Sequence, residues 1–386
     1  MAFAFTSWKI SGYGWSLLNS DKKKNTHHEN TKERKHEKKH MHYTKVNIES
    51  FGYELPPHVV TSEDIESRLE PLYEALHFQK GTLESLTGIQ ERRFWDPGFK
   101  MSQGAAAAGQ KAIERAGIPK ELIRMMVYGG VCRENLEPAT ACAVAHALDL
   151  GPETLIYDVT NACLGILNGM VQVADAIELG HIQAGLVLSC ESARGIIDST
   201  VQRLLASRNM AVFKQTVATL TGGSGAVAVL LTDTSLAKQG HRLLGGVWRN
   251  AARHHGLCIW GPATPVTSSD GQAMNTDSVG VLKNGVTLGI ETFQALVSAL
   301  DLTADQPDKI ICHQVGVTHQ NTILKSIGIP REKDFTTFRY LGNIGTVSLP
   351  ITAAIADERG VLQKNDLVGL LGIGSGLNCI MLGVEW

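Results

Sequence analysis

Disulfide chemistry has little support in this sequence. The cysteines form an odd set with no C-x-x-C pair and no disulfide-like spacing, at positions 132, 142, 163, 190, 258, 312 and 379. This usage indicates a reducing, cytoplasmic setting. The segment HHGLC, His254–Cys258, carries metal-ligating side chain types, but no second ligand pair accompanies it, so we expect no metal.

A secretion leader and a strong net charge are missing as well. The opening MAFAFTSWKISGYGWSLLNS has no basic start, no sufficiently long apolar run and no evident cleavage site. Net charge is −2, and because residues 1–45 hold ten Lys or Arg against four Asp or Glu, the remainder carries −8. An acidic body argues against nucleic-acid binding.

Residues 1–41 hold almost nothing apolar in their second half. Lys, His and Glu crowd together there, so we expect this leader to be disordered. A metal-binding histidine tract, a nucleic-acid arm and a targeting leader are all open interpretations. Because Met41 precedes a strand-like segment, we favour translation starting at Met41, or a dispensable tail.

Aromatic residues are scarce, at 6%, yet 43% of the chain is hydrophobic, enough for one large core or two of ordinary size. From Lys45 onward, short apolar runs alternate with helix-like stretches, which predicts an α/β architecture. We place two halves at 42–236 and 237–386. Leu367–Val384 is uncharged and as long as a membrane helix, but its five glycines indicate two strands joined by a turn, so we expect no membrane span.

The periodicity places the main elements. We expect helices over 101–117, 163–180, 285–302 and 346–360, and strands over 155–160, 184–192, 225–233 and 308–315. A helical insertion over 194–215 either covers a pocket or simply connects two elements.

Cys163 lies where a strand gives way to a helix, in the stretch YDVTNACLGILNGM. A free cysteine is commonly a small buried hydrophobe. At this junction, however, the thiol would lie at the positive end of a helix dipole, which lowers its pKa and favours a nucleophile.

Three further loops supply groups that suit a thiol nucleophile. His313 follows an apolar strand, Asn343 lies in a glycine-flanked loop, and the Gly374-Ser375-Gly376 turn can present a backbone amide. Taken singly, each fits a packing or turn role. Together they supply the nucleophile, hydrogen-bond donors and oxyanion site that carbon–carbon bond formation on a thioester needs.

These motifs resemble a family. TGIQERRFWD, TNACLG, HQV and GNIGTVSLP resemble, in order and spacing, the conserved segments of thiolase-superfamily condensing enzymes of the 3-oxoacyl-acyl-carrier-protein synthase III group, over Met41 to Trp386. The resemblance implies a five-layered αβαβα thiolase fold built from two similar halves, normally a homodimer. It also implies that Cys163 is the nucleophile and that His313 and Asn343 are catalytic.

Two differences from the housekeeping synthase indicate a subgroup of this family. RENLEPATA and GIGSGLNC, with Gly316 where the housekeeping synthase has Asn, resemble the OleA-type enzymes that condense two acyl-CoA molecules head to head. In those enzymes a glutamate reaches across the dimer as a base, and the matching residue is Glu137. Without these neighbours, Glu137 would be a solvated or helix-capping carboxylate.

The resemblance implies an acyltransferase that performs a Claisen condensation on acyl-CoA or acyl-carrier-protein thioesters, with no cofactor. Ser375 and Cys163 would supply the oxyanion amides. Two alternatives stay open: a decarboxylative synthase III that uses a malonyl carrier in fatty-acid or polyketide synthesis, and acyl transfer to an amine or alcohol. Arg92 and Arg93 either contact CoA phosphates or form salt bridges.

Overall fold

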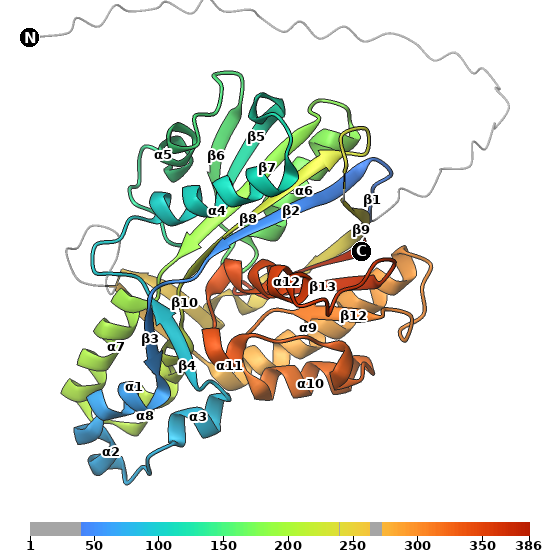
Figure 1. The fold of residues 1–386 in the computed structure, drawn as a ribbon. Helices are drawn as coiled ribbons and strands as arrows, with labels where there is room; N and C mark the ends of the chain where they lie inside the picture. Colours follow the sequence, from blue (N-terminus) through green and yellow to red (C-terminus); the bar gives the residue numbers. More distant parts are fainter. Residues whose placement is uncertain (1–39, 239, 263–271) are drawn as a thin grey trace, which may run out of the picture. The chain divides into compact units, whose positions relative to one another are not determined.

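The computed structural model describes residues 40–238, 240–262 and 272–386 (Figure 1). The leader predicted over 1–41 lies outside the described residues except for its last two positions. The boundaries of the two predicted halves, 42–236 and 237–386, stay a prediction.

The N-terminal half contributes five strands: β2 (Val46–Glu54), β5 (Ile123–Gly129), β6 (Leu155–Val159), β7 (Ala184–Glu191) and β8 (Gly225–Asp233). They lie in the order β2-β8-β7-β5-β6. Strand β5 is parallel to β6 and β7, whereas β8 is antiparallel to β7 and β2. Strand β6 therefore lies at an edge.

The C-terminal half repeats this arrangement with β9 (His241–Asn250), β12 (Lys309–Cys312), β13 (Leu367–Gly374) and β14 (Asn378–Glu385). Their order is β9-β14-β13-β12, with β12 parallel to β13 and β14 antiparallel to both of its neighbours. Each of these strands thus corresponds to one of the first half. A two-residue pairing of β9 with β2 joins the two sets of strands into one ten-stranded sheet, and β1 (Met41–His42) also pairs with β9.

Six helices complete the layers: α4 (Met101–Ala116), α5 (Thr140–Ala147), α6 (Gly165–Glu178), α9 (Ser278–Ala299), α10 (Val317–Ile327) and α12 (Ser348–Glu358). Helix α4 contacts β2, β7 and β8, and α5 contacts β5 and β6. Helix α12 contacts strands of both halves, α9 contacts β9 and β14, and α10 packs on α9. The five layers αβαβα of the thiolase fold are therefore present.

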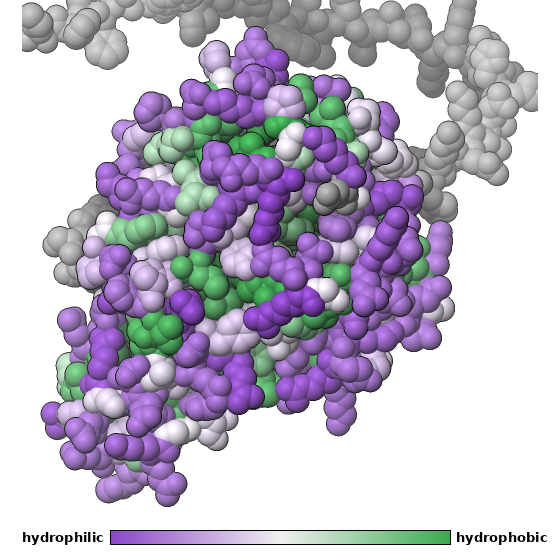
Figure 2. Space-filling view, in the orientation of Figure 1, coloured by the Kyte–Doolittle hydropathy of each residue, from purple (hydrophilic) through white to green (hydrophobic). Residues whose placement is uncertain are grey.

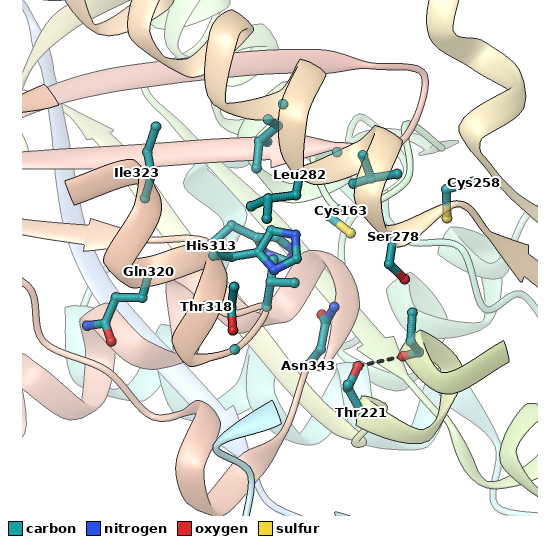
Figure 3. A pocket seen from close by; sticks show the side chains of 18 of the residues that line it. Cys163, Thr221, Cys258, Ser278, Leu282, His313, Thr318, Gln320, Ile323 and Asn343 are labelled. Atoms are coloured by element: carbon teal, nitrogen blue, oxygen red, sulfur yellow. Dashed lines mark hydrogen bonds between the residues drawn. The ribbon is translucent and has the colours of Figure 1, made fainter. Parts of the chain in front are cut away.

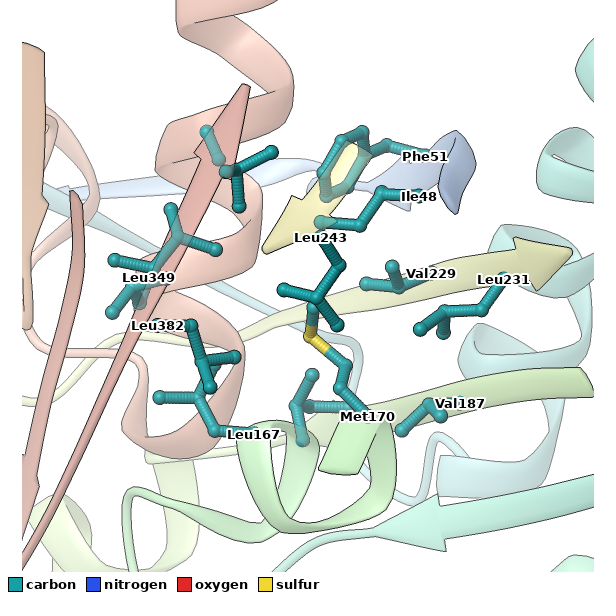
Figure 4. Close-up of a cluster of buried hydrophobic side chains, with 14 of the residues drawn as sticks. Ile48, Phe51, Leu167, Met170, Val187, Val229, Leu231, Leu243, Leu349 and Leu382 are labelled. Atoms are coloured by element: carbon teal, nitrogen blue, oxygen red, sulfur yellow. The ribbon is translucent and has the colours of Figure 1, made fainter. Parts of the chain in front are cut away.

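Alternation along the strands explains this layering. In β7, Leu186 and Leu188 join the hydrophobic cluster under α4, whereas Val187 joins the central cluster with α6 and α12. Figure 4 shows the central cluster, where Met170 of α6 lies near Val229 and Leu231 of β8. Because both faces are covered, every residue of β7 is buried, as is typical of strands buried on both sides.

Shorter elements form a separate lobe beside the sheet. Side chains of its helices, such as Leu72, Ile197 and Phe213, make a cluster of their own. These elements are α1 (Ser62–Arg68), α2 (Glu70–Leu76), α3 (Thr82–Thr87), α7 (Arg194–Ser207), α8 (Met210–Thr216), η2 (Val217–Thr221), β3 (His58–Thr61), β4 (Glu91–Phe94), β10 (Cys258–Pro262) and β11 (Gln272–Thr276). The connections hold η1 (Lys120–Leu122), η3 (Ala252–Leu257), η4 (Arg331–Lys333), α11 (Phe338–Leu341) and η5 (Gly345–Val347).

One expected boundary was wrong. Helix α9 begins at Ser278 rather than at residue 285, because the Asp277 side chain accepts a hydrogen bond from the Gly280 amide and caps it. Among the described residues, we find no helix with the length and apolar character needed to span a membrane. On the face drawn in Figure 2, hydrophilic side chains predominate and hydrophobic ones form scattered patches.

Candidate active site

Cys163 lies in a tight connection between β6 and α6. Ala162, just before it, has a left-handed backbone with φ of 45°, and the Leu164 amide donates to the Asn161 carbonyl at 2.9 Å. Gly165 opens α6 against Gly129 of β5, so closely that a Cβ on Gly165 would lie 2.7 Å from the Gly129 carbonyl carbon. This backbone contact holds the thiol at the N-terminal end of α6, as the sequence predicts.

The expected lowering of the Cys163 pKa was wrong. Burial raises the pKa of the thiol to about 12, and the nearby Cys258 thiol and Glu191 carboxylate act in the same direction. Removing a thiolate from water here outweighs the stabilisation that a helix N-terminus provides. The resting thiol is therefore protonated.

His313 follows β12 and is held through its neighbours. Its amide donates to the Leu371 carbonyl at 3.0 Å, and the Cys312 amide donates to Asp334 Oδ1 at 3.2 Å. The Gln314 side chain donates to the Cys312 carbonyl at 2.6 Å. Burial, followed by the nearby His319, lowers the pKa of His313 to about 4, so the imidazole is neutral near neutral pH.

Asn343 lines the same cavity as Cys163 and His313. Its Oδ1 accepts from the Gly345 amide at 3.1 Å, and its backbone is tied to Thr221 and Gly223. Since the oxygen is occupied, the Nδ2 group is the one available to donate to a ligand.

The Gly374-Ser375-Gly376 turn lies directly against the nucleophile. A Cβ on Gly374 would lie 3.3 Å from the Cys163 nitrogen. Beyond the turn, Asn378 donates to Asn161 at 3.1 Å, and Asn161 donates to Asn168 of α6 at 2.8 Å. This row of amides fastens the C-terminal turn to the connection that carries Cys163.

One cavity of about 460 Å³ gathers the residues from both halves. Cys163, His313, Asn343 and Ser375 all line it, and Figure 3 shows the first three of these beside one another. Most of the remaining lining is apolar, and α9 and α10 contribute Leu282, Val286 and Ile323 to it. The arrangement suits a long apolar chain that ends in a carbonyl group next to the thiol.

Comparison with known proteins agrees with this geometry. Residues 98–238 match the thiolase N-terminal domain family, and 297–386 match the 3-oxoacyl-acyl-carrier-protein synthase III C-terminal family. An acyl-CoA:acyl-CoA alkyltransferase of Shewanella oneidensis is 49% identical over 349 residues, which are 90% of this chain and 100% of the relative. The chain belongs to the acyl-CoA:acyl-CoA alkyltransferase family.

Other members are similar in sequence and structure. The alkyltransferase of Xanthomonas campestris is 35% identical over 347 residues, 90% of this chain and 100% of that protein. A crystal structure of Xanthomonas campestris OleA, a Cys→Ser variant with bound lauric acid and lauroyl-CoA, matches with a TM-score of 0.83 over 89% of this chain and 100% of that one. Further structures of that protein carry substitutions of a cysteine, a glutamate and a histidine.

Glu137 is the one predicted site residue that does not line the cavity of its own chain. It is exposed, in the connection between β5 and α5, next to Leu136, whose exposure is 87%. The role of Glu137 as a base in the cavity of a partner subunit stays a prediction.

Several residues near the site were not predicted as site residues from the sequence. Cys258, Ser278 and His319 line the cavity, and Glu191 is a buried carboxylate close to Cys163. Only Glu191 could have been found from the sequence, because it is an acidic residue at the end of the otherwise apolar strand AGLVLSCE. Cys258 was considered only as a metal ligand, and Ser278 and His319 have no distinctive pattern.

The two arginines considered for CoA phosphates do not meet the cavity. Arg92 is fully buried and donates to Ser62 Oγ at 3.0 Å and to the Leu220 carbonyl at 3.1 Å. Arg93 donates to the Pro56 carbonyl at 3.2 Å. Both arginines therefore make hydrogen bonds within the fold and have a structural role. Within the described parts of the chain, no group of three or more His, Cys, Asp or Glu could hold a metal ion.

Proposed function

We propose that this protein condenses two acyl-CoA molecules head to head through an acyl-Cys163 intermediate, giving a β-ketoacyl-CoA and free CoA. The observation that carries the proposal is the apolar cavity that Cys163, His313, Asn343 and Ser375 line together. Relatives named acyl-CoA:acyl-CoA alkyltransferase support the choice of substrates. Relatives named synthase III are only 27% and 24% identical, which gives less support to the malonyl route.

The first half-reaction is transfer of an acyl group to Cys163. Because the thiol is protonated at rest and His313 is neutral, the thiol proton passes to the imidazole as sulfur attacks the thioester carbonyl. The departing CoA thiolate takes that proton and leaves as the free thiol. The Cys163 amide and an amide of the Ser375 turn stabilise the oxyanion.

The second half-reaction forms the carbon–carbon bond. A base removes an α-proton from the second acyl-CoA, and the enolate attacks the acyl-Cys163 carbonyl. The bond to sulfur breaks, and Cys163 regains a proton. Neutral His313 and the Nδ2 group of Asn343 donate hydrogen bonds to the enolate oxygen, which lowers the barrier to proton removal. The reaction balances without an oxidant, a reductant or a cofactor.

Glu137 of a partner subunit is the proposed base. Its carboxylate lies on an exposed connection and so is free to enter another chain. In the structures of Xanthomonas campestris OleA, the substituted glutamate precedes the substituted cysteine by 26 positions, which is also the separation of Glu137 and Cys163.

We also propose that the protein acts as a homodimer in the cytoplasm. Acyl-carrier protein is the alternative to CoA as the carrier of the acyl group. Strand β6 lies at the edge of the sheet, and Leu155 on it is 58% exposed. An edge strand with an exposed apolar side chain favours pairing with a second copy.

The test is incubation with a long-chain acyl-CoA alone, and separately with a malonyl carrier protein and an acyl-CoA primer, with products read by mass spectrometry. A β-keto acid or its ketone from acyl-CoA alone is expected. Product only in the malonyl reaction would overturn the proposal. Glu137→Gln should abolish the condensation, and Cys163→Ala should abolish all turnover.

A further inference from the structure

Glu191 is a buried carboxylate that the mechanism above does not use. It ends β7, is 4% exposed, and within the described residues forms no ion pair. Its Oε1 accepts from the Val131 amide at 2.9 Å, and its Oε2 accepts from the Cys132 amide at 3.1 Å. Burial raises its pKa, so the site spends free energy to keep a carboxyl group here.

The two amides belong to the start of the connection that carries Glu137, residues 130–139, which we call the glutamate loop. At its other end, Asp158 of β6 accepts from the Thr140 and Ala141 amides at 2.9 and 2.8 Å. Between these anchors, residues 135–138 are exposed. The glutamate loop therefore has both ends fastened by carboxylates and a free middle that carries Glu137.

Glu191 also borders the site of its own chain. A Cβ on Gly345 would lie 3.5 Å from Glu191 Cγ, and the Gly345 amide holds Asn343 Oδ1. The carboxylate is close enough to Cys163 to raise the thiol pKa. Two roles thus have to be separated: one in its own cavity and one through the loop.

We propose that Glu191 is a positioning residue whose carboxylate fixes the start of the glutamate loop and so sets where Glu137 enters the cavity of the partner subunit. The inference rests on the proposed function, because it requires Glu137 to act as a base across a dimer. The two loop amides are held by one residue, whereas backbone amides of a surface loop ordinarily meet water.

The substitution Glu191→Gln tests this role. It keeps the size of the side chain but turns an NH₂ group toward one of two backbone N–H groups, so the start of the loop must shift. Since a misplacement of about 1 Å can lower a rate by about 10²-fold, we expect condensation to fall by about that factor. Acylation of Cys163, read as the burst of CoA released with the first turnover, should not fall with it, because removing the Glu191 charge acts to lower the thiol pKa rather than to raise it. Equal loss of both steps would overturn the proposal.

A matched control is Glu66→Gln. Glu66 is also 4% exposed and accepts from the backbone amides of Gly81 and Leu83, at 2.7 and 2.6 Å, but it does not line the cavity. This variant should lose stability without changing the ratio of condensation to acylation. If Glu191→Gln does not fold, Glu191→Asp keeps the carboxylate, and the same ratio decides the question.

Mixed dimers separate the two roles of Glu191. In a dimer of a Cys163→Ala subunit with a Glu191→Gln subunit, the intact thiol receives the glutamate loop of the subunit whose Glu191 is intact. Activity well above that of either parent is therefore expected. No recovery would show that Glu191 acts in its own cavity and would overturn the proposal.

The reference is a mixed dimer of Cys163→Ala with Glu137→Gln, which must recover activity if Glu137 acts across the dimer. If the reference fails, the base assignment of the proposed function fails, and the role of Glu191 falls with it. If the reference recovers and the Glu191 pair does not, only the present inference fails. A dimer of Glu191→Gln with Glu137→Gln should be no more active than the Glu191→Gln parent, since neither cavity then receives an intact loop. Recovery above that level would contradict the inference.

Discussion

Cys163 is held as a neutral thiol until a substrate arrives. Burial raises its pKa to about 12, and His313 beside the same cavity has its pKa lowered to about 4 by burial. A thiolate–imidazolium pair is therefore absent at rest. The proton must move as the thioester is attacked, which limits reaction with other electrophiles.

Alkylation of the free enzyme should follow this protonation state. The rate of iodoacetamide modification at Cys163 should rise steadily from about pH 7 to about pH 10, because the thiolate fraction grows tenfold per pH unit below the pKa. Peptide mass spectrometry measures the rate. Modification of the exposed Cys142 in the same sample is the control that the reagent is active. A rate that levels off above about pH 9 would show an ordinary thiol and contradict the prediction.

His313 should make stability depend on pH. Its pKa is about 4 in the folded protein and 6.5 when unperturbed, so between these values the unfolded chain binds more protons. Stability should fall as the pH drops from 6.5 toward 4, by on the order of 3 kcal/mol. Denaturant unfolding at several pH values measures it, and His313→Gln should lose this part of the slope. Equal slopes in both proteins would refute the lowered pKa.

Site residues at the ends of regular elements could be predicted from sequence. Cys163, His313 and Ser375 each follow an apolar strand, and Asn343 lies in a glycine turn. The structure brings these four residues to one cavity, and their catalytic roles stay predictions. The pKa of Cys163 was beyond reach because burial depends on segments far away in the chain. His319 was missed because a histidine within a helix has no pattern of its own.

At the level of elements, the contact of β5 with α6 decides where the nucleophile sits. Gly129 and Gly165 touch through their backbones, and either Cβ would lie within 2.7 Å of the other residue. The sequence predicts the strand and the helix from their periodicity. Their closeness was not foreseen, because a glycine pair distant in sequence carries no periodicity.

Gly165→Ala should push α6 away from β5. We expect a loss of about 1–3 kcal/mol in unfolding free energy, as for other overpacked sites, together with slower acylation of Cys163. Gly195→Ala in α7 is the control, since a Cβ there meets nothing within 4 Å; it should be neutral or stabilise by up to about 1 kcal/mol. Chemical denaturation compares them, and equal stability of the two variants would refute the close contact.

For the molecule as a whole, all predicted site residues lie within the compact unit Lys39–Trp386. The alternation of strands and helices predicted the α/β class. The division of labour between the halves, with Cys163 in the first and His313, Asn343 and Ser375 in the second, followed from the family resemblance. The two similar halves were likewise implied by the resemblance, because the halves share no visible identity from which the repeat could have been read.

A chain that begins at Met41 should fold and condense acyl-CoA like the full chain, with a thermal midpoint changed by less than about 2 °C. A chain that begins at Val46 is the control. It lacks the buried Met41 and Tyr43, and the Tyr43 hydroxyl donates to Asp175 at 2.7 Å, so it should melt at a lower temperature. Differential scanning calorimetry compares them, and a large loss in the Met41 chain would contradict the prediction.

Strand β9 has a consequence for connectivity. Gly246 pairs with Met41 on one side and with Leu382 on the other, and Trp386 stacks on His241 with ring centroids 3.8 Å apart. Both ends of the folded unit therefore flank one strand. A linker of about six to eight residues would join them, so the chain suits circular permutation with new ends opened in a surface connection.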